Sequence, residues 1–105
     1  MLKLCVYVPE THLEQVKQAL FDAGAGRMSH YDCCSWQTIG TGQFRPLEGA
    51  HPAVGVIDEV ARVPEWKLEM ICSKDLAPAI ARALYEAHPY ETPAFDFVQL
   101  WQLPE

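Results

Sequence analysis

The sequence has little positive charge, with eight lysine and arginine residues against fourteen aspartate and glutamate residues among 105. Its formal net charge is −6 at pH 7. Nucleic-acid-binding proteins concentrate lysine and arginine against the phosphate backbone, so this composition argues against a nucleic-acid partner. Long apolar runs are also missing, because Lys3 interrupts the first strand-like residues and Pro9 ends them. We therefore expect neither a signal peptide nor a membrane-spanning helix.

The spacing of the cysteines lacks the common metal and disulfide patterns. The four cysteines stand at positions 5, 33, 34 and 72, with no CxxC pair. Adjacent side chains of an extended strand point to opposite faces, which disfavours a shared metal or bond at Cys33 and Cys34. This usage predicts reduced thiols and a cytoplasmic protein. A cysteine nucleophile would need a neighbouring base, and His30 is the only local candidate.

Half of the residues are apolar, which is enough for one hydrophobic core in a chain of this length. We expect a single domain over residues 1–105. Its first half predicts a strand over residues 2–8, a helix over residues 13–23 and a second strand over residues 31–38. Thr11 and Glu14 have the spacing of a capping box for the helix, and Gly24 is placed to end it.

The second half of the sequence repeats this arrangement. Residues 60–73 predict a strand in which Pro64 marks a bulge or an edge, and Asp75 is placed to cap a helix over residues 76–87. A last strand is expected over residues 94–101. The order βαββαβ predicts the α+β, ferredoxin-like split βαβ fold, with an antiparallel sheet and both helices on one face.

Apolar side chains fall on both faces of the predicted end strands. Val6 and Val8 alternate with Cys5 and Tyr7, and the last strand has Val98 opposite to its phenylalanines. A domain of two layers leaves one sheet face in water unless another subunit covers it. We therefore expect a homo-oligomer, either a dimer or a trimer.

The densest cluster of turn-forming residues is GTGQFRPLEGAHP, residues 40–52. Backbone N–H groups at Gly40 and Gly42, together with Arg45, could hold a small anionic ligand, although neither GxGxxG nor GxxxxGK[ST] is present. Glu48 joins this candidate ligand site. The alternative is a structural loop in which Arg45 pairs with Glu48, with Glu91 or across a subunit boundary.

A second cluster, AHPYETPAFDF, covers residues 87–97 and adds Tyr90 and Glu91 to the candidate ligand site. His51 and His88 each precede a proline. With a nearby carboxylate they would form a divalent-metal site, with zinc as the candidate ion, if the two clusters meet. The alternative is that each histidine completes a turn through hydrogen bonds to the backbone. Tyr90 and Glu91 could equally join the last strand to the sheet.

Residues 24–52 and 87–100 resemble the inserted middle domain of the Nif-three-like (NGG-one-interacting factor three) family, through GTGxFRPLEGAxP and HPYExPAxD. The resemblance implies a fold like that of CutA and the PII signalling proteins, and it favours a trimer. Full-length members carry this insertion between two halves that hold a pair of metal ions. The resemblance therefore implies a stand-alone version of the insertion, and the family's GTP cyclohydrolase label attaches to the halves that are absent.

Three functions follow from these patterns. The first is a non-catalytic regulatory module that binds a small ligand or a metal, and the lack of a catalytic motif favours it. The second is a metal-dependent enzyme of hydrolase type that uses His51, His88 and a carboxylate. The third is a purely structural oligomerisation unit.

Overall fold

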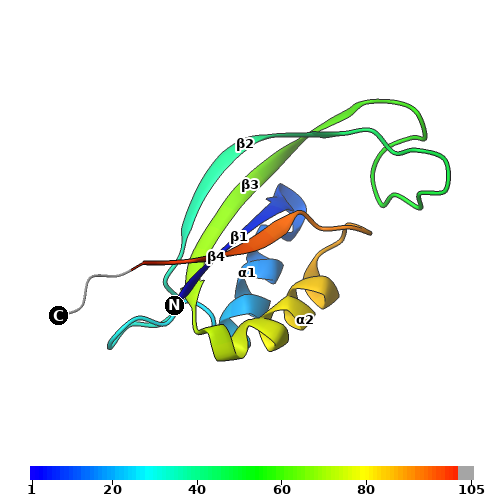
Figure 1. Cartoon of the computed structure of the whole chain (residues 1–105). Coiled ribbons are helices and arrows are strands. Elements are labelled where there is room, and N and C mark those ends of the chain that lie inside the picture. The colour runs from blue at the N-terminus through cyan, green and yellow to red at the C-terminus, as the bar shows by residue number, and fades with distance from the viewer. Residues whose placement is uncertain (102–105) are drawn as a thin grey trace.

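A four-stranded antiparallel sheet carries two helices on one face in the computed structural model, which describes residues 1–101 (Figure 1). The strands stand in the order β2-β3-β1-β4, and a 3-10 turn precedes each helix. This arrangement confirms the predicted α+β, ferredoxin-like fold. The elements are β1 (Leu2–Pro9), η1 (Glu10–His12), α1 (Leu13–Asp22), β2 (Trp36–Phe44), β3 (Ala61–Cys72), η2 (Lys74–Leu76), α2 (Ala77–Ala87) and β4 (Phe95–Gln99).

The core lies between the helices and one face of the sheet. Alternation along β1 and β3 brings residue pairs such as Leu4 with Met70 and Val6 with Leu68 onto this face. Val16 of α1 and Ile80 of α2 cover them and are fully buried. Burial of each large aliphatic side chain contributes about 1.5–3 kcal/mol, so this face fixes the fold.

Both helices begin differently from the prediction. Thr11 and Asp75 lie inside the 3-10 turns, and neither makes a side-chain cap of the following α-helix. The Ser73 hydroxyl accepts the backbone N–H of Asp75 at 3.3 Å and so caps the turn before α2. The expected end of α1 is confirmed, because Gly24 has φ of 105° and continues the chain in the left-handed region.

The second strand, β2, lies further along the chain than the sequence predicted. The second strand is present, but the predicted bounds over residues 31–38 are wrong, because β2 runs from Trp36 to Phe44 and a loop precedes it. Pairing with the long strand β3 selects this register and draws the two glycines, Gly40 and Gly42, into the strand. Pro64 pairs with β2 in an unbroken register and lies one residue beyond the last pair with β1, so it occupies a local edge.

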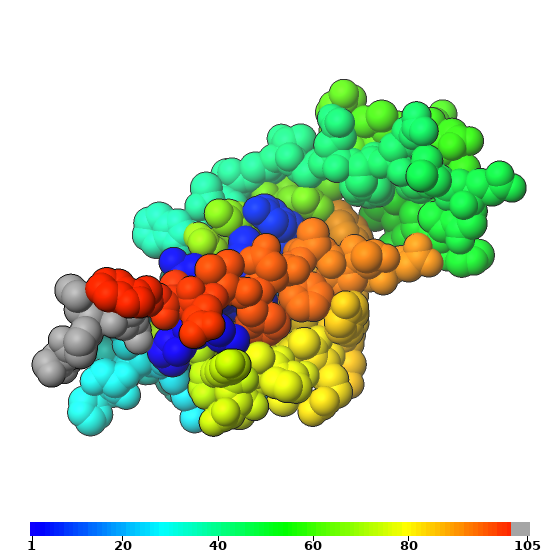
Figure 2. All heavy atoms as spheres, in the orientation of Figure 1, coloured from blue at the N-terminus to red at the C-terminus, as the bar shows by residue number. Residues whose placement is uncertain are grey.

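The open face of the sheet is mixed rather than apolar. Cys5 and Tyr7 share it with Lys67, Glu69 and Asp96. The expectation that an apolar open face drives self-association is therefore wrong. Large exposed apolar side chains lie on β2, where Trp36 shares the open face beside Glu69, and on the loop over residues 45–60. This loop extends past the helices (Figure 2). The exposed apolar side chains are Trp36, Ile39, Leu47, Val54, Val56, Ile57 and Val60. Over residues 1–101, no helix has the length and apolar character needed to cross a membrane.

Candidate ligand-binding pocket

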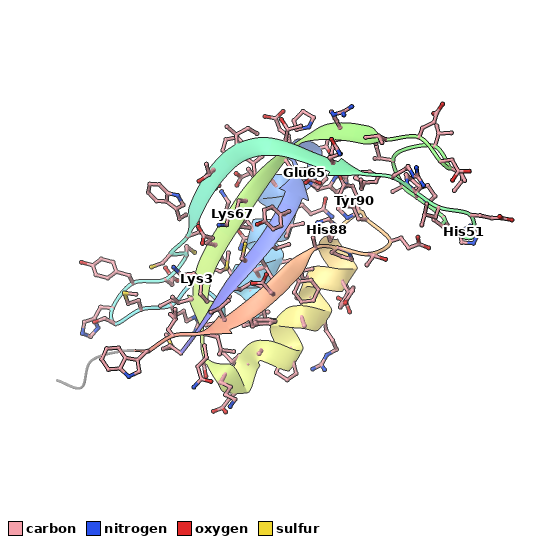
Figure 3. All side chains as sticks on the ribbon, turned by 45° about the horizontal axis from the view of Figure 1, so that its top comes forward. Lys3, His51, Glu65, Lys67, His88 and Tyr90 are labelled. Atoms are coloured by element: carbon pink, nitrogen blue, oxygen red, sulfur yellow. The ribbon has the colours of Figure 1, made fainter. Side chains whose placement is uncertain are left out.

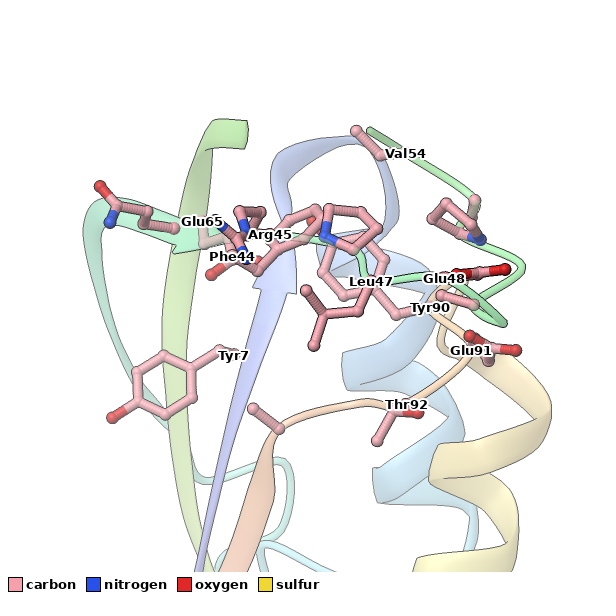
Figure 4. Close-up of a pocket in the computed structure, with 16 residues that line it drawn as sticks. Tyr7, Phe44, Arg45, Leu47, Glu48, Val54, Glu65, Tyr90, Glu91 and Thr92 are labelled. Atoms are coloured by element: carbon pink, nitrogen blue, oxygen red, sulfur yellow. The ribbon is translucent and has the colours of Figure 1, made fainter. Parts of the chain in front are cut away.

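A pocket of about 490 Å³ lies between the loop over residues 45–60, the segment after α2 and one end of the sheet (Figure 4). The loop supplies one wall, residues 90–94 supply the opposite wall, and Tyr7 and Glu65 come from β1 and β3. The lining residues are Tyr7, Gln43, Phe44, Arg45, Pro46, Leu47, Glu48, Ala50, Pro52, Ala53, Val54, Glu65, Tyr90, Glu91, Thr92 and Ala94.

Four of the predicted ligand residues line this one pocket, although they come from two distant segments. Arg45 and Glu48 belong to the loop, and Tyr90 and Glu91 follow α2. Gly40 and Gly42 line a neighbouring groove over the open face of the sheet. Because both glycines are strand residues, they do not form the loop of backbone donors that the sequence predicted.

The two His-Pro segments lie side by side, as the sequence predicted. The backbone N–H of His51 donates to Oε1 of Glu91 at 3.2 Å, which joins the loop to the segment after α2. The rings of the two histidines are not placed together. Figure 3 shows His51 out on the loop and His88 near the sheet.

His88 is a buried structural residue in this arrangement, with 5% of its surface exposed. Its Nε2 lies 2.7 Å from the carbonyl oxygen of Tyr7, and its Nδ1 accepts the backbone N–H of Tyr90 at 3.1 Å. These two bonds select the neutral tautomer protonated at Nε2. Burial lowers the pKa of His88, and its bond to the Tyr7 carbonyl partly opposes this effect.

Both nitrogens of His88 are therefore occupied by the backbone. Over residues 1–101, no group of three or more histidine, cysteine, aspartate or glutamate side chains is placed to hold a metal ion. Zinc binding by His51 and His88 stays a prediction, and it would require His88 to give up one of its two hydrogen bonds.

Tyr90 belongs to the wall of the pocket that follows α2. Its ring packs against Phe44 at a centroid distance of 5.8 Å and against His88 at 5.0 Å. Burial, and then the nearby Glu65 carboxylate, raise the pKa of Tyr90 to about 12. The Tyr90 hydroxyl and the Glu65 carboxylate are close enough for the charge of Glu65 to act on Tyr90, but their geometry is not that of a hydrogen bond. The Tyr90 hydroxyl is consequently buried without a partner among the described residues.

The sequence did not predict Glu65 as a site residue. In the sequence, Glu65 is only one of several polar residues that alternate with apolar residues along a strand. Its position depends on Gly42: a Cβ atom built on Gly42 would overlap the Glu65 carboxylate. A Cβ atom on Gly40 would meet nothing within 4 Å. Glycine at position 42 thus leaves the space into which the carboxylate folds.

Arg45 does not have its predicted partner. Within the described part of the chain, no carboxylate oxygen lies within 4.0 Å of its guanidinium, so the expected pairing with Glu48 or Glu91 is wrong for a single chain. Glu91 instead accepts the backbone N–H of His51. Arg45 is exposed at the pocket, where its charge remains available to solvent or a ligand.

The cysteines lie outside the pocket, and all four thiols are free. Cys5 and Cys72 are buried, and burial raises the pKa of both thiols, which disfavours the reactive thiolate. Cys33 is exposed, and the Cys34 thiol lies 3.6 Å from the carbonyl oxygen of Asp32. Within residues 1–101, neither thiol has a hydrogen bond to His30.

No family model matches the chain. It is 45% identical over 98 residues to a GTP cyclohydrolase 1 type 2 homolog of Mycobacterium leprae, covering 93% of this chain and 26% of the relative. A Bacillus subtilis protein of the same name is 41% identical over 97% of this chain and 27% of its own length. The chain spans about a quarter of the length of these curated relatives.

Solved structures extend the similarity to the fold. A Bacillus cereus protein related to NIF3 has a TM-score of 0.82 at 39% identity, over 94% of this chain and 25% of that one. CutA1 of Pyrococcus horikoshii has a TM-score of 0.71 at 17% identity, over 100% of this chain and 88% of that one. The likeness to one portion of NIF3-related proteins and to the CutA fold agrees with the resemblance seen in the sequence.

Proposed function

We propose that this domain is a non-catalytic module that binds a small ligand in the pocket beside Tyr90. One observation carries the proposal: Arg45, Glu48, Tyr90 and Glu91, from two segments separated in sequence by β3 and α2, line a single pocket. Concave, mostly apolar pockets with a few convergent polar groups are the usual form of small-molecule sites. Phe44, Leu47 and the other apolar lining residues supply the first feature here, and the charged residues supply the second.

A regulatory role follows from the two walls of the pocket. One wall is the loop over residues 45–60, which carries much of the exposed apolar surface, and the other wall is anchored to β1 through His88. A ligand that contacts both walls stabilises the loop in one position relative to the sheet. Binding would thereby control what that apolar loop contacts.

We further propose that the domain forms homo-oligomers through the β2–β3 hairpin and its loop. The support is the exposed apolar surface of this region, where Val56 is 59% exposed and Leu47 is 57% exposed. Water-exposed apolar side chains concentrated on one protruding element are typical of an association surface. Either a dimer or a trimer would cover them.

The names of the relatives do not by themselves define the activity of this domain. We propose that residues 1–105 form one cytoplasmic, CutA-like domain, with a ligand site made by a single chain. The relatives named after GTP cyclohydrolase are about four times as long as this chain. The chain matches only about a quarter of the length of each relative. We therefore propose binding, and not catalysis, at this pocket.

Screening a library of small metabolites by NMR tests the proposal. Amide signals of residues 44–54 and 90–94 should shift together on binding. Ala53→Trp, which fills the pocket, should abolish the shifts, whereas Gln15→Trp, at an exposed position of α1, should leave them unchanged. The proposal fails if no compound binds, or if the bound compounds are insensitive to Ala53→Trp.

A further inference from the structure

We infer that the ligand of this pocket is a small organic cation, an ammonium or guanidinium group on an apolar stem, whose charged end is held by Glu65. This inference rests on the proposed binding function and names the class of ligand. It replaces the small anion that the glycine-rich sequence suggested, because the structure places Gly40 and Gly42 in a paired strand.

The charge of the lining favours a cation. The pocket is lined by three carboxylates, those of Glu48, Glu65 and Glu91, and by one guanidinium, that of Arg45. The net charge of these lining groups is −3 + 1 = −2. Arg45 makes no ion pair with these carboxylates, so it does not neutralise any one of them directly. The whole chain has a net charge of −6, which adds to the attraction for a positive ligand.

Glu65 and Tyr90 are arranged to receive N–H donors. The Glu65 carboxylate is half-buried and lies over Gly42, where no side chain displaces it. The Tyr90 hydroxyl oxygen is buried beside it without a hydrogen-bond partner among the described residues. An ammonium carries three donors and a guanidinium five, so either group can donate to the carboxylate and the hydroxyl together.

The rest of the pocket fits an apolar stem. The rings of Phe44 and Tyr90, at a centroid distance of 5.8 Å and tilted by 58°, present aromatic surface beside the charged end. Leu47 and Val54 extend this apolar surface along the loop (Figure 4), and Pro46 also lines the pocket. Aromatic faces attract cations as well as methylene groups, so both parts of the ligand are matched.

Four probes with the same apolar stem test the sign of the charge: n-butylammonium, n-butylguanidinium, n-butyrate and n-butanol. Titration followed by NMR should give saturable shifts at Tyr90 and Phe44 with the two cations, with affinities at least tenfold above those of butyrate and butanol. Stronger binding of butyrate overturns the inference and leaves the proposed binding function intact. Failure of the whole metabolite library in the earlier screen would instead overturn the binding function itself.

Two glycine variants provide a matched test of the anchor. In Gly42→Ala the new methyl group displaces the Glu65 carboxylate, and the cation affinity should fall about tenfold or more, as in Glu65→Gln. Gly40→Ala lies two residues away in β2, meets no atom within 4 Å, and should bind like the wild type. Equal affinities of folded Gly42→Ala and Gly40→Ala proteins would overturn the role of Glu65.

The cation can be a free amine or a lysine side chain of another protein. A short peptide with one central lysine and blocked ends separates these sources, because it adds a backbone to the same butylammonium group. Tighter binding of the peptide than of n-butylammonium supports a protein source, and weaker binding supports a free amine. If neither the peptide nor n-butylammonium binds, the inference is wrong.

Discussion

The Nε2 nitrogen of His88 lies 2.7 Å from the carbonyl oxygen of Tyr7 and ties the segment after α2 to the first strand. The other ring nitrogen accepts the N–H of Tyr90, so one imidazole fixes two stretches of backbone. Tyr90 lines the pocket, and the position of its backbone depends on His88. The ring is a structural clamp for one wall of the site.

Replacing His88 should destabilise the protein. His88→Ala removes two hydrogen bonds and leaves the Tyr7 carbonyl and the Tyr90 N–H in need of other partners, so we expect a loss of about 2–4 kcal/mol. Urea unfolding measures this loss. His30→Ala, at an exposed loop position, is the control and should change the free energy of unfolding by less than about 0.5 kcal/mol. Similar values for the two variants would contradict the clamp.

The stability conferred by His88 should depend on pH. Its pKa is lowered in the folded protein, so the unfolded chain, with an ordinary value of 6.5, takes up the proton more readily. The contribution is therefore fully present above about pH 6.5 and is lost as the pH falls through the folded pKa. Glu65 opposes this shift and His12 adds to it. The difference in unfolding free energy between wild type and His88→Gln should shrink below pH 6.5, and a constant difference would contradict the burial of a neutral ring.

The hydroxyl of Tyr90 should contribute nothing to folding. It is buried without a partner, so Tyr90→Phe should keep the wild-type stability or raise it by up to about 1 kcal/mol, while the ring packing is retained. A spectrophotometric titration should also lose the phenol with a pKa of about 12. A clear loss of stability in Tyr90→Phe would show that the hydroxyl has a bonded partner.

The predicted zinc site can be tested against the structure by isothermal titration. Because both nitrogens of His88 have backbone partners, we expect the heat with zinc to be the same for the wild type and for His51→Ala. A smaller heat for His51→Ala would support the zinc site predicted from the sequence. It would also mean that His88 changes its hydrogen bonds when the metal binds.

Self-association should depend on the hairpin loop. Sedimentation equilibrium at micromolar concentration should give at least twice the chain mass of 11.8 kDa. Val56→Asp combined with Ile57→Asp places two charges on the exposed loop and should produce monomers. Val98→Asp, on the open face of β4, is the matched control and should leave the mass unchanged. The opposite result would return the interface to the open face of the sheet.

The sequence by itself determined the elements that depend on local periodicity. Alternation at Leu4, Val6 and Val8 predicts β1 and its buried face, and the apolar stripe through Ile80 and Leu84 predicts α2. The two proline-rich clusters also identified the segments that meet at the pocket. These features follow from the spacing of side chains within a few residues. That spacing does not depend on which distant segments pack against the element.

Only the tertiary structure decided the register of β2, the location of Glu65 against Gly42 and the bonds of His88. A strand can shift along its neighbour without any change in its own sequence, and here pairing with β3 placed Gly40 and Gly42 inside the sheet. Likewise, the partner of the His88 ring is Tyr7, 81 residues away. Contacts of this kind depend on how strands and helices pack together, and no local pattern of residues contains that information.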